Sequence, residues 1–173
     1  MKRISSYYLR PIHEADAEAY LDLLRSIESD SPYALLEDGE RQTTIAEQRS
    51  EIQTVLAQSN QMIWVVEDRD RLVAWLGAWG ERYRRVSHSA LVGVGVRATH
   101  RRQGLASELF QALERWAPSV GVRRLELTVA VPNQAAWRLY QKLGFRIEGT
   151  KSKSYRIDNI LVDEYFMAKE VES

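Results

Sequence analysis

Hydrophobic positions recur along the chain with two periods, and these divide it into helices and strands. Apolar residues three or four apart predict helices over about 14–27, 45–56, 103–116 and 134–143. β-branched and aromatic runs predict strands over 3–11, 62–67, 72–79, 91–96, 123–131 and 145–148. The stretches 154–157 and 161–168 predict one final strand, interrupted near 158–159. The resulting order β-α-α-β-β-β-α-β-α-β-β predicts an α/β fold with helices around a mixed sheet.

Local signals fix several boundaries. The stretch 68–71 reads as the turn of a hairpin between the strands 62–67 and 72–79. Thr44 and Glu47 form a capping-box pattern, and Asn133 is a good N-cap for the helix that follows it. Gly144 suits the C′ position that ends that helix. Because a helix joins the strands 91–96 and 123–131, these two are expected to pair in parallel.

Two stretches permit both a structural and a functional interpretation. Trp75 and Trp79 lie on one side of their strand, where tryptophan more often fills a core than stacks on a ligand. The segment 33–42 has no clear period and carries Glu37, Asp38 and Glu40. It is either a solvated loop or a loop that lines the site of an acceptor molecule.

Composition restricts the class of protein. The chain has 173 residues, enough for one domain spanning 1–173 with its own core. Its 24 basic and 24 acidic residues cancel, which argues against nucleic-acid or membrane binding through a basic surface. It contains no cysteine, which excludes disulfides, zinc–thiolate sites and a thiol nucleophile. The N-terminus lacks the apolar core of a signal peptide and no run could span a bilayer, so a cytoplasmic protein is expected.

The stretch 90–117 combines a strand, a basic turn and a helix start. Arg101, Arg102 and Gly104 lie where the strand 91–96 has ended and helical spacing begins. The unpaired N–H groups of a helix's first turn, together with its dipole, favour an anion there, and basic side chains add to this. No Walker A loop and no dinucleotide fingerprint is present. A site for a small anionic ligand is therefore expected.

The motif Arg101-x-x-Gly104-x-Ala106 resembles the signature of the GCN5-related N-acetyltransferases, the GNAT family. The element order matches that family over nearly the whole chain. The resemblance implies that the backbone of 101–106 holds the pyrophosphate of acetyl-coenzyme A (acetyl-CoA).

Further motifs strengthen the resemblance. Val94-Gly95-Val96 stands where family strands bind the pantetheine arm. The run from Val129 through Asn133 and Tyr140 to Gly144-Phe145 resembles the second half of the site, and 163–167 resembles a closing strand. Gly93 and Gly95 suit a close backbone approach or simply relieve crowding in the sheet. The cofactor-binding residues expected by resemblance are Val94, Val96, Arg101, Arg102, Gln103, Gly104, Leu105, Ala106, Asn133 and Tyr140.

Without cysteine, direct attack of an amine on the thioester is expected. The family places a tyrosine near the thioester sulfur, which makes Tyr140 the candidate acid; its ordinary pKa of about 10 keeps it protonated at neutral pH. A backbone N–H at Val94 or Val96 could hold the carbonyl oxygen. Glu126 is either a base that acts through water or a structural carboxylate paired with Arg124. Glu81, Tyr83 and His88 are weaker base candidates.

The sequence therefore predicts an acetyl-CoA-dependent N-acetyltransferase without a metal. Its acceptor would be a primary amine of a small, amino-acid-like molecule or of a protein. A non-catalytic acyl-CoA sensor or partner-binding module on the same fold is the main alternative. A phosphotransferase is disfavoured because no metal-binding acid or P-loop lysine is placed for it. A homodimer is expected from base rates alone.

Overall fold

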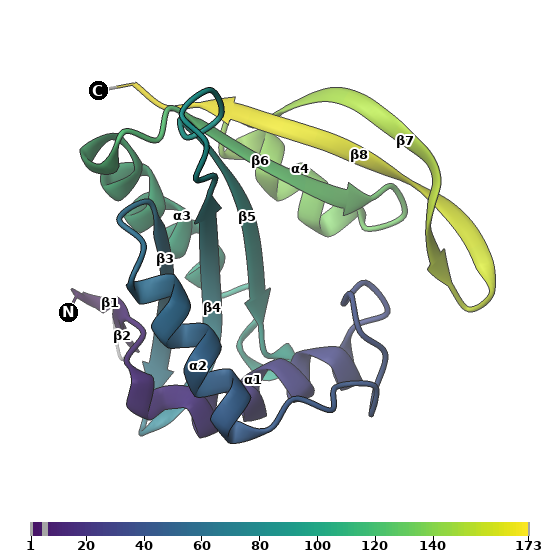
Figure 1. The fold of residues 1–173 in the computed structure, drawn as a ribbon. Coiled ribbons are helices and arrows are strands. Elements are labelled where there is room, and N and C mark those ends of the chain that lie inside the picture. The colour runs from purple at the N-terminus through teal and green to yellow at the C-terminus, as the bar shows by residue number, and fades with distance from the viewer. Residues whose placement is uncertain (1, 5–6, 173) are drawn as a thin grey trace.

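One mixed β-sheet organises the protein (Figure 1). The computed structural model describes residues 2–4 and 7–172, in which eight strands pair in the order β1-β2-β3-β4-β5-β6-β8-β7. The strands are β1 (Lys2–Ile4), β2 (Tyr7–Pro11), β3 (Gln61–Asp68), β4 (Arg71–Gly80), β5 (Ser89–Val96), β6 (Arg124–Ala130), β7 (Arg146–Ile157) and β8 (Ile160–Glu170). The α/β fold and the mixed sheet predicted from the sequence are confirmed.

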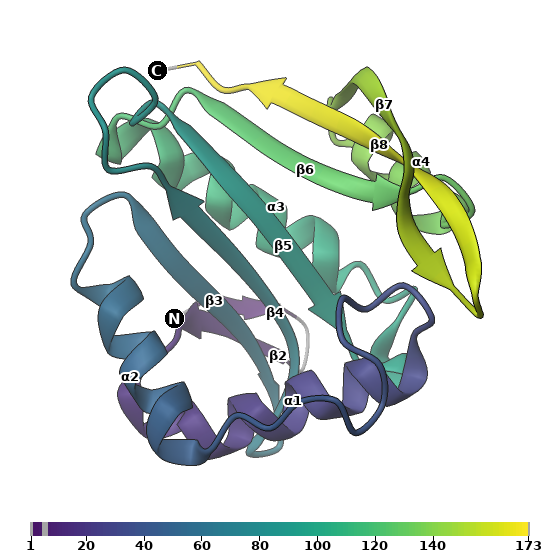
Figure 2. The same ribbon diagram turned by 45° about the vertical axis from the view of Figure 1, so that its right-hand side comes forward.

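Helices cover both faces of the sheet (Figure 2). They are α1 (Ala17–Asp30), α2 (Ile45–Leu56), α3 (Leu105–Trp116) and α4 (Gln134–Lys142). Helices α1 and α2 pack on one face around Tyr20, Leu24 and Ile52. Helix α3 packs on the other face through Leu105, Leu109 and Leu113, the apolar stripe predicted from the sequence, and α4 lies on the same side. No helix in the described part of the chain is long and apolar enough to cross a membrane.

The N-terminal segment differs from its prediction. The single strand expected over 3–11 is a pair of antiparallel strands, β1 and β2, and residues 5–6 between them lie outside the described residues. The predicted helix 14–27 begins with a 3-10 turn over Glu14–Asp16 and then continues as α1 to Asp30.

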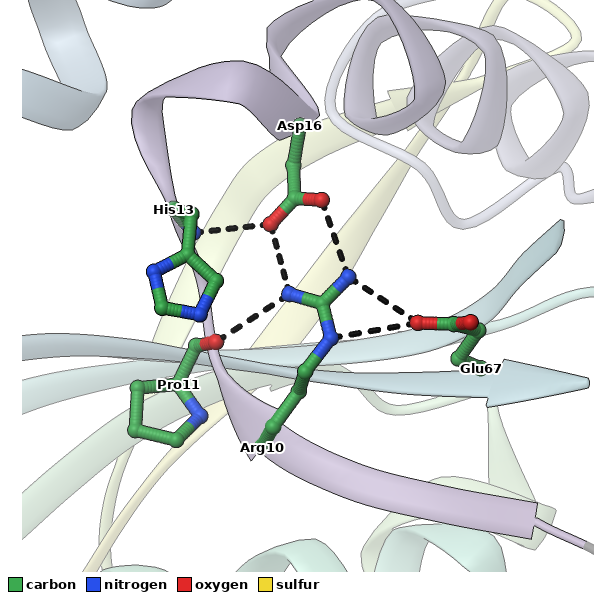
Figure 3. Close-up of polar contacts among 5 residues, drawn as sticks. All are labelled: Arg10, Pro11, His13, Asp16 and Glu67. Atoms are coloured by element: carbon green, nitrogen blue, oxygen red, sulfur yellow. Dashed lines mark hydrogen bonds and ion pairs between the residues drawn. The ribbon is translucent and has the colours of Figure 1, made fainter. Parts of the chain in front are cut away.

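An arginine ties this region together (Figure 3). The Arg10 guanidinium donates to both oxygens of Asp16, at 2.7 and 2.9 Å, and to Glu67 of β3 at 3.0 and 3.1 Å. Asp16 also accepts from the backbone N–H of His13 at 2.7 Å. One side chain thereby fixes the end of β2, the 3-10 turn and β3 relative to one another.

The hairpin turn predicted at 68–71 is confirmed. Strands β3 and β4 are joined through Arg69 and Asp70, both of which have positive φ, 46° and 66°. Two positive φ values identify the turn type whose twist matches that of paired strands.

The C-terminal strand prediction is wrong. Residues 154–157 are the end of β7 rather than part of the last strand, and Asp158 and Asn159 form the turn into β8. Both turn residues have positive φ, 48° and 64°, so this turn also has the geometry of a tight hairpin. The result is a long two-stranded arm that extends beyond the rest of the sheet (Figure 1).

Candidate functional site

The sheet opens between its two parallel strands. Strands β5 and β6 pair in parallel, as predicted, at Ser89↔Arg124, Ala90↔Leu125 and Leu91↔Glu126, and then diverge (Figure 2). Beyond this point β5 stays paired with β4, and β6 with β8. Because the Arg97 N–H donates to Val73 of β4, alternation along β5 directs the backbone groups of Val94 and Val96 into the gap. Apart from the Val96 carbonyl, which accepts from Arg101, these groups are available to an added strand-like ligand.

A cleft of about 1090 Å³ fills this opening. Of the residues expected from the sequence, nine line it: Val94, Val96, Arg101, Arg102, Gly104, Leu105, Ala106, Asn133 and Tyr140. Gln103 and Glu126 are not among the lining residues. The structure therefore brings two separate sequence regions, 94–106 and 133–140, to one cavity.

The basic loop ends at the N-terminus of α3. Gly104 is the N-cap residue with φ +82°, and it supplies no side-chain cap, so the first-turn N–H groups of α3 face outward. In the described structure no heavy atom lies within 4 Å of where a Cβ on Gly104 would stand. Glycine at this position is explained by its left-handed backbone, and the space in front of it is open to a ligand.

The neighbouring basic side chains have different roles. Arg101 donates from Nε to the Val96 carbonyl oxygen at 3.1 Å, which links the loop to the end of β5. Arg102 is exposed at the cleft and has φ +63°.

Two nearby polar side chains do not line the cleft. The Gln103 side chain accepts from the Tyr7 hydroxyl and donates to the Thr99 carbonyl. Arg97 is buried and donates to the Leu72 carbonyl and to Asp22.

Tyr140 lies at the opposite wall, on α4. The Asn133 side chain caps this helix by accepting from the Ala136 N–H at 3.3 Å, and Gly144 ends it with φ +91°, as predicted. The Tyr140 ring packs edge-on against Phe110 at 5.7 Å between ring centres and is 9% exposed. Burial raises the pKa of Tyr140 to about 12, so its hydroxyl stays protonated at neutral pH.

Glu126 is held in an ion pair. Its carboxylate accepts from Arg124 Nε at 2.5 Å, and Arg124 also pairs with Glu148 of β7. This pairing with Arg124 agrees with the interpretation of Glu126 as a structural carboxylate. The carboxylate neutralises a guanidinium on its own strand and lies outside the cleft.

The sequence located only part of the other half of the cleft, through the segment 33–42. It is lined from α1, α2, β4 and β8 by Tyr20, Gln48, Trp75 and Glu164 among others, and it includes part of the segment 33–42. Two tyrosines join that segment to the far side of the opening. Tyr155 donates to the Ala34 carbonyl at 2.5 Å, and Tyr33 to the Pro132 carbonyl at 3.4 Å. Residues 33–35 and Arg41 line the cleft, whereas Glu37, Asp38 and Glu40 are exposed and are not among its lining residues, so each interpretation holds for part of the segment.

Trp75 and Trp79 explain the glycines in β5. Their rings lie over Gly93, whose Cβ would stand 3.2 Å from atoms of both indoles. The Trp75 ring also contacts Tyr20 edge-on, and its Nε1 has no hydrogen-bond partner among the described residues. The two tryptophans therefore pack against the core of α1 and α2 and also form the cleft wall.

The fold is that of known acetyltransferases. The structure matches the acetyltransferase of the GNAT family from Streptococcus pneumoniae with a TM-score of 0.91, at 25% identity over 96% of this chain and 99% of that one. It also matches yncA from Salmonella typhimurium, a putative acetyltransferase solved with its cofactor acetyl-CoA. That TM-score is 0.85, at 16% identity over 98% of this chain and 96% of that one.

Sequence comparison defines the family. Residues 13–145 match the family model described as "Acetyltransferase (GNAT) family". The chain is 32% identical over 149 residues to the uncharacterized N-acetyltransferase YoaA of Bacillus subtilis, which covers 82% of this chain and 80% of the relative. The chain therefore belongs to the GNAT acetyltransferase family, as the sequence motifs predicted.

A functionally named relative covers less of the chain. The L-amino acid N-acetyltransferase AaaT of Escherichia coli is 39% identical over 93 residues, which is 51% of this chain and 55% of the relative. The chain thus aligns with about half the length of this curated relative.

Proposed function

We propose that the protein is an acetyl-CoA-dependent N-acetyltransferase that moves the acetyl group directly to a primary amine. The observation that carries this proposal is the divergence of β5 and β6 directly beside the N-terminus of α3. Membership of the GNAT family supports it. A structural neighbour solved with acetyl-CoA and relatives named as N-acetyltransferases agree with it.

The residues present fit the cofactor. The first-turn N–H groups of α3, with Arg101 and Arg102 beside them, suit a pyrophosphate, because they combine free donors with positive charge. The backbone groups of Val94 and the Val96 N–H suit the amides of a pantetheine arm. Asn133 and Tyr140 line the far wall of the same cleft. Acetyl-CoA would supply the activated acetyl group as a thioester.

Two tasks then fall to this chain, and a third falls to solvent. A backbone N–H of β5, at Val94 or Val96, holds the carbonyl oxygen as negative charge develops on it. The Tyr140 hydroxyl donates its proton to the departing sulfur when the carbon–sulfur bond breaks and the carbon–nitrogen bond forms. The attacking amine loses a proton to water in the open cleft, and Glu126 is not assigned to that step because it is paired outside the cleft.

A steady-state assay tests the proposal. Release of free thiol is followed while acetyl-CoA and an amine are varied together. Direct transfer in a ternary complex predicts intersecting double-reciprocal lines, whereas parallel lines would indicate a covalent acyl-enzyme and overturn direct transfer. Saturable acetyl-CoA binding without thiol release across a broad amine panel would instead support the sensor alternative.

A further inference from the structure

We propose that the amine acceptor is a cationic molecule that carries no carboxylate group, with its positive charge held by Glu164. This inference rests on the proposed function and specifies the chemical class of its second substrate. It follows from the charges and unpaired polar atoms in the half of the cleft formed by α1, α2, β4 and β8.

Glu164 is a buried carboxylate on the cleft wall. It is 9% exposed and comes from β8, opposite Ala130, which also lines the cleft. Its Oε2 accepts from the Ser154 hydroxyl at 2.9 Å, and the nearest ammonium, Lys151, is 3.6 Å away on a side chain that is 53% exposed. A buried carboxylate with so weak a partner favours a cationic ligand.

A second part of the cleft lining, on α2, contains a buried hydrogen-bond acceptor without a partner among the described residues. Gln48 of α2 is 2% exposed, and its Nε2 donates to Glu51 at 3.0 Å, which fixes the orientation of the amide. Its Oε1 therefore remains an acceptor, and it has no partner among the described residues. Gln48 and Glu51 both line the cleft. An ammonium group, which only donates, matches this part of the lining.

Among the described residues, the cations near this half of the cleft already face carboxylates. Its basic residue, Arg41, is committed to Glu28 through Nε at 2.8 Å and the terminal nitrogen at 2.5 Å. The other basic side chains that line the cleft within the described residues are His100, Arg101 and Arg102, all in the basic loop at the start of α3. A free amino acid would bring a further negative charge into a region that holds Glu51 and Glu164, while Arg41 and Lys151 already face Glu28 and Glu164.

Among the described residues, the buried side-chain donor that lacks a partner in this half of the cleft is neutral. Trp75 Nε1 packs against Gly95 and has no hydrogen-bond partner in the described structure, so it offers no positive charge to a carboxylate. Amino amides, which lose the negative charge of the parent amino acid, are therefore the best match among amines related to amino acids. This expectation contrasts with the L-amino acid named as the substrate class of the E. coli relative.

Matched pairs of probes test the proposal. L-leucinamide is compared with L-leucine, and cadaverine with L-lysine, so that each pair differs by one carboxylate. Binding to the protein loaded with coenzyme A is measured by calorimetry, and turnover with acetyl-CoA by thiol release. We expect the carboxylate-free member of each pair to bind and react at least about tenfold better, the scale of a hydrogen bond to a charged group.

Two variants locate the charge. Glu164→Gln should weaken binding of L-leucinamide about tenfold and leave acetyl-CoA binding unchanged. Glu170→Gln removes the same charge from the same strand outside the cleft and should change neither. A preference for the free amino acids, or failure of the carboxylate-free probes to bind, overturns the proposal. Equal binding by Glu164→Gln and the parent overturns the role of Glu164. If the parent protein does not bind acetyl-CoA, the proposed function fails instead.

Discussion

The indole nitrogen of Trp75 lies 2.6 Å from the point that a Cβ on Gly95 would occupy. The methyl carbon Cδ1 of Ile27 lies 2.8 Å from the same point. Gly95 therefore holds the cleft wall, helix α1 and strand β5 in contact, because any side chain would push them apart.

Gly95→Ala should destabilise the protein by about 1–3 kcal/mol, the usual cost of adding a methyl group to a filled core. Gly149→Ala is the matched control, since no heavy atom lies within 4 Å of its Cβ position in the described structure. The control should change stability by less than about 0.5 kcal/mol. Urea unfolding measures both. Equal midpoints for the two variants would contradict the packing role of Gly95.

Tyr140→Phe should lower kcat by about 100-fold or more, the scale of a lost general acid, with an unchanged Kd for acetyl-CoA. Burial raises the pKa of Tyr140, and among the described residues no charged or hydrogen-bonding neighbour contributes, so removing the hydroxyl should not destabilise the protein. Tyr165→Phe, on the strand β8, serves as the control and should retain activity. An active Tyr140→Phe variant would remove Tyr140 from the mechanism.

The buried tyrosine also predicts alkaline instability. Folding raises the pKa of Tyr140 to about 12, above the value of about 10 for an unfolded chain. The contribution of the neutral Tyr140 hydroxyl to the free energy of unfolding is therefore complete below about pH 10 and is lost as the pH rises through 12. The free energy of unfolding should be lower by about 1 kcal/mol at pH 11. Thermal melting from about pH 9 to about pH 11 tests this. The Tyr140→Phe variant should lose less stability over that range than the parent.

The ion pairs of Arg10 predict the opposite dependence at acid pH (Figure 3). Burial acts to raise the pKa of Asp16, but the hydrogen bonds from Arg10 and the His13 N–H outweigh it and lower the pKa. This stabilisation is present above about pH 4 and disappears as pH falls through the folded-state pKa. Arg10→Gln should lower the free energy of unfolding by about 1–2 kcal/mol at neutral pH, a value between those of surface and buried ion pairs. The variant should also lose less stability than the parent as the pH falls from neutral to acid. An equal loss of stability toward acid pH in the variant and the parent would contradict this role of Arg10 and Asp16.

Features that depend on neighbouring residues were predictable from the sequence. The cap at Asn133, the turn at 68–71 and the apolar stripe of α3 each depend on residues that lie only a few positions apart in the chain. The element order and the motifs at Gly104 and Tyr140 were enough to identify the family.

Features that depend on distant contacts were not predictable. Asp158 and Asn159 looked like an interruption because the length of β7 is set by its pairing with β8, not by an apolar pattern in its own exposed residues. The half of the cleft formed by α1, α2, β4 and β8 combines Gln48, Trp75 and Glu164 from three parts of the chain. A single glutamate on a strand gives no sign of its burial, and a glutamine in a helix gives no sign that its oxygen lacks a partner.

Calorimetric titration with acetyl-CoA tests the central claim most directly, with Gly104→Trp and Gly121→Trp measured beside the parent. Both glycines have left-handed backbones, with φ +82° and +81°, and open space at the Cβ position, but only Gly104 lines the cleft. The strain of substitution is therefore matched. We predict that the parent and Gly121→Trp bind acetyl-CoA with the same Kd and that Gly104→Trp loses binding. A folded parent that does not bind, or a Gly104→Trp variant that binds like the parent, would contradict the account.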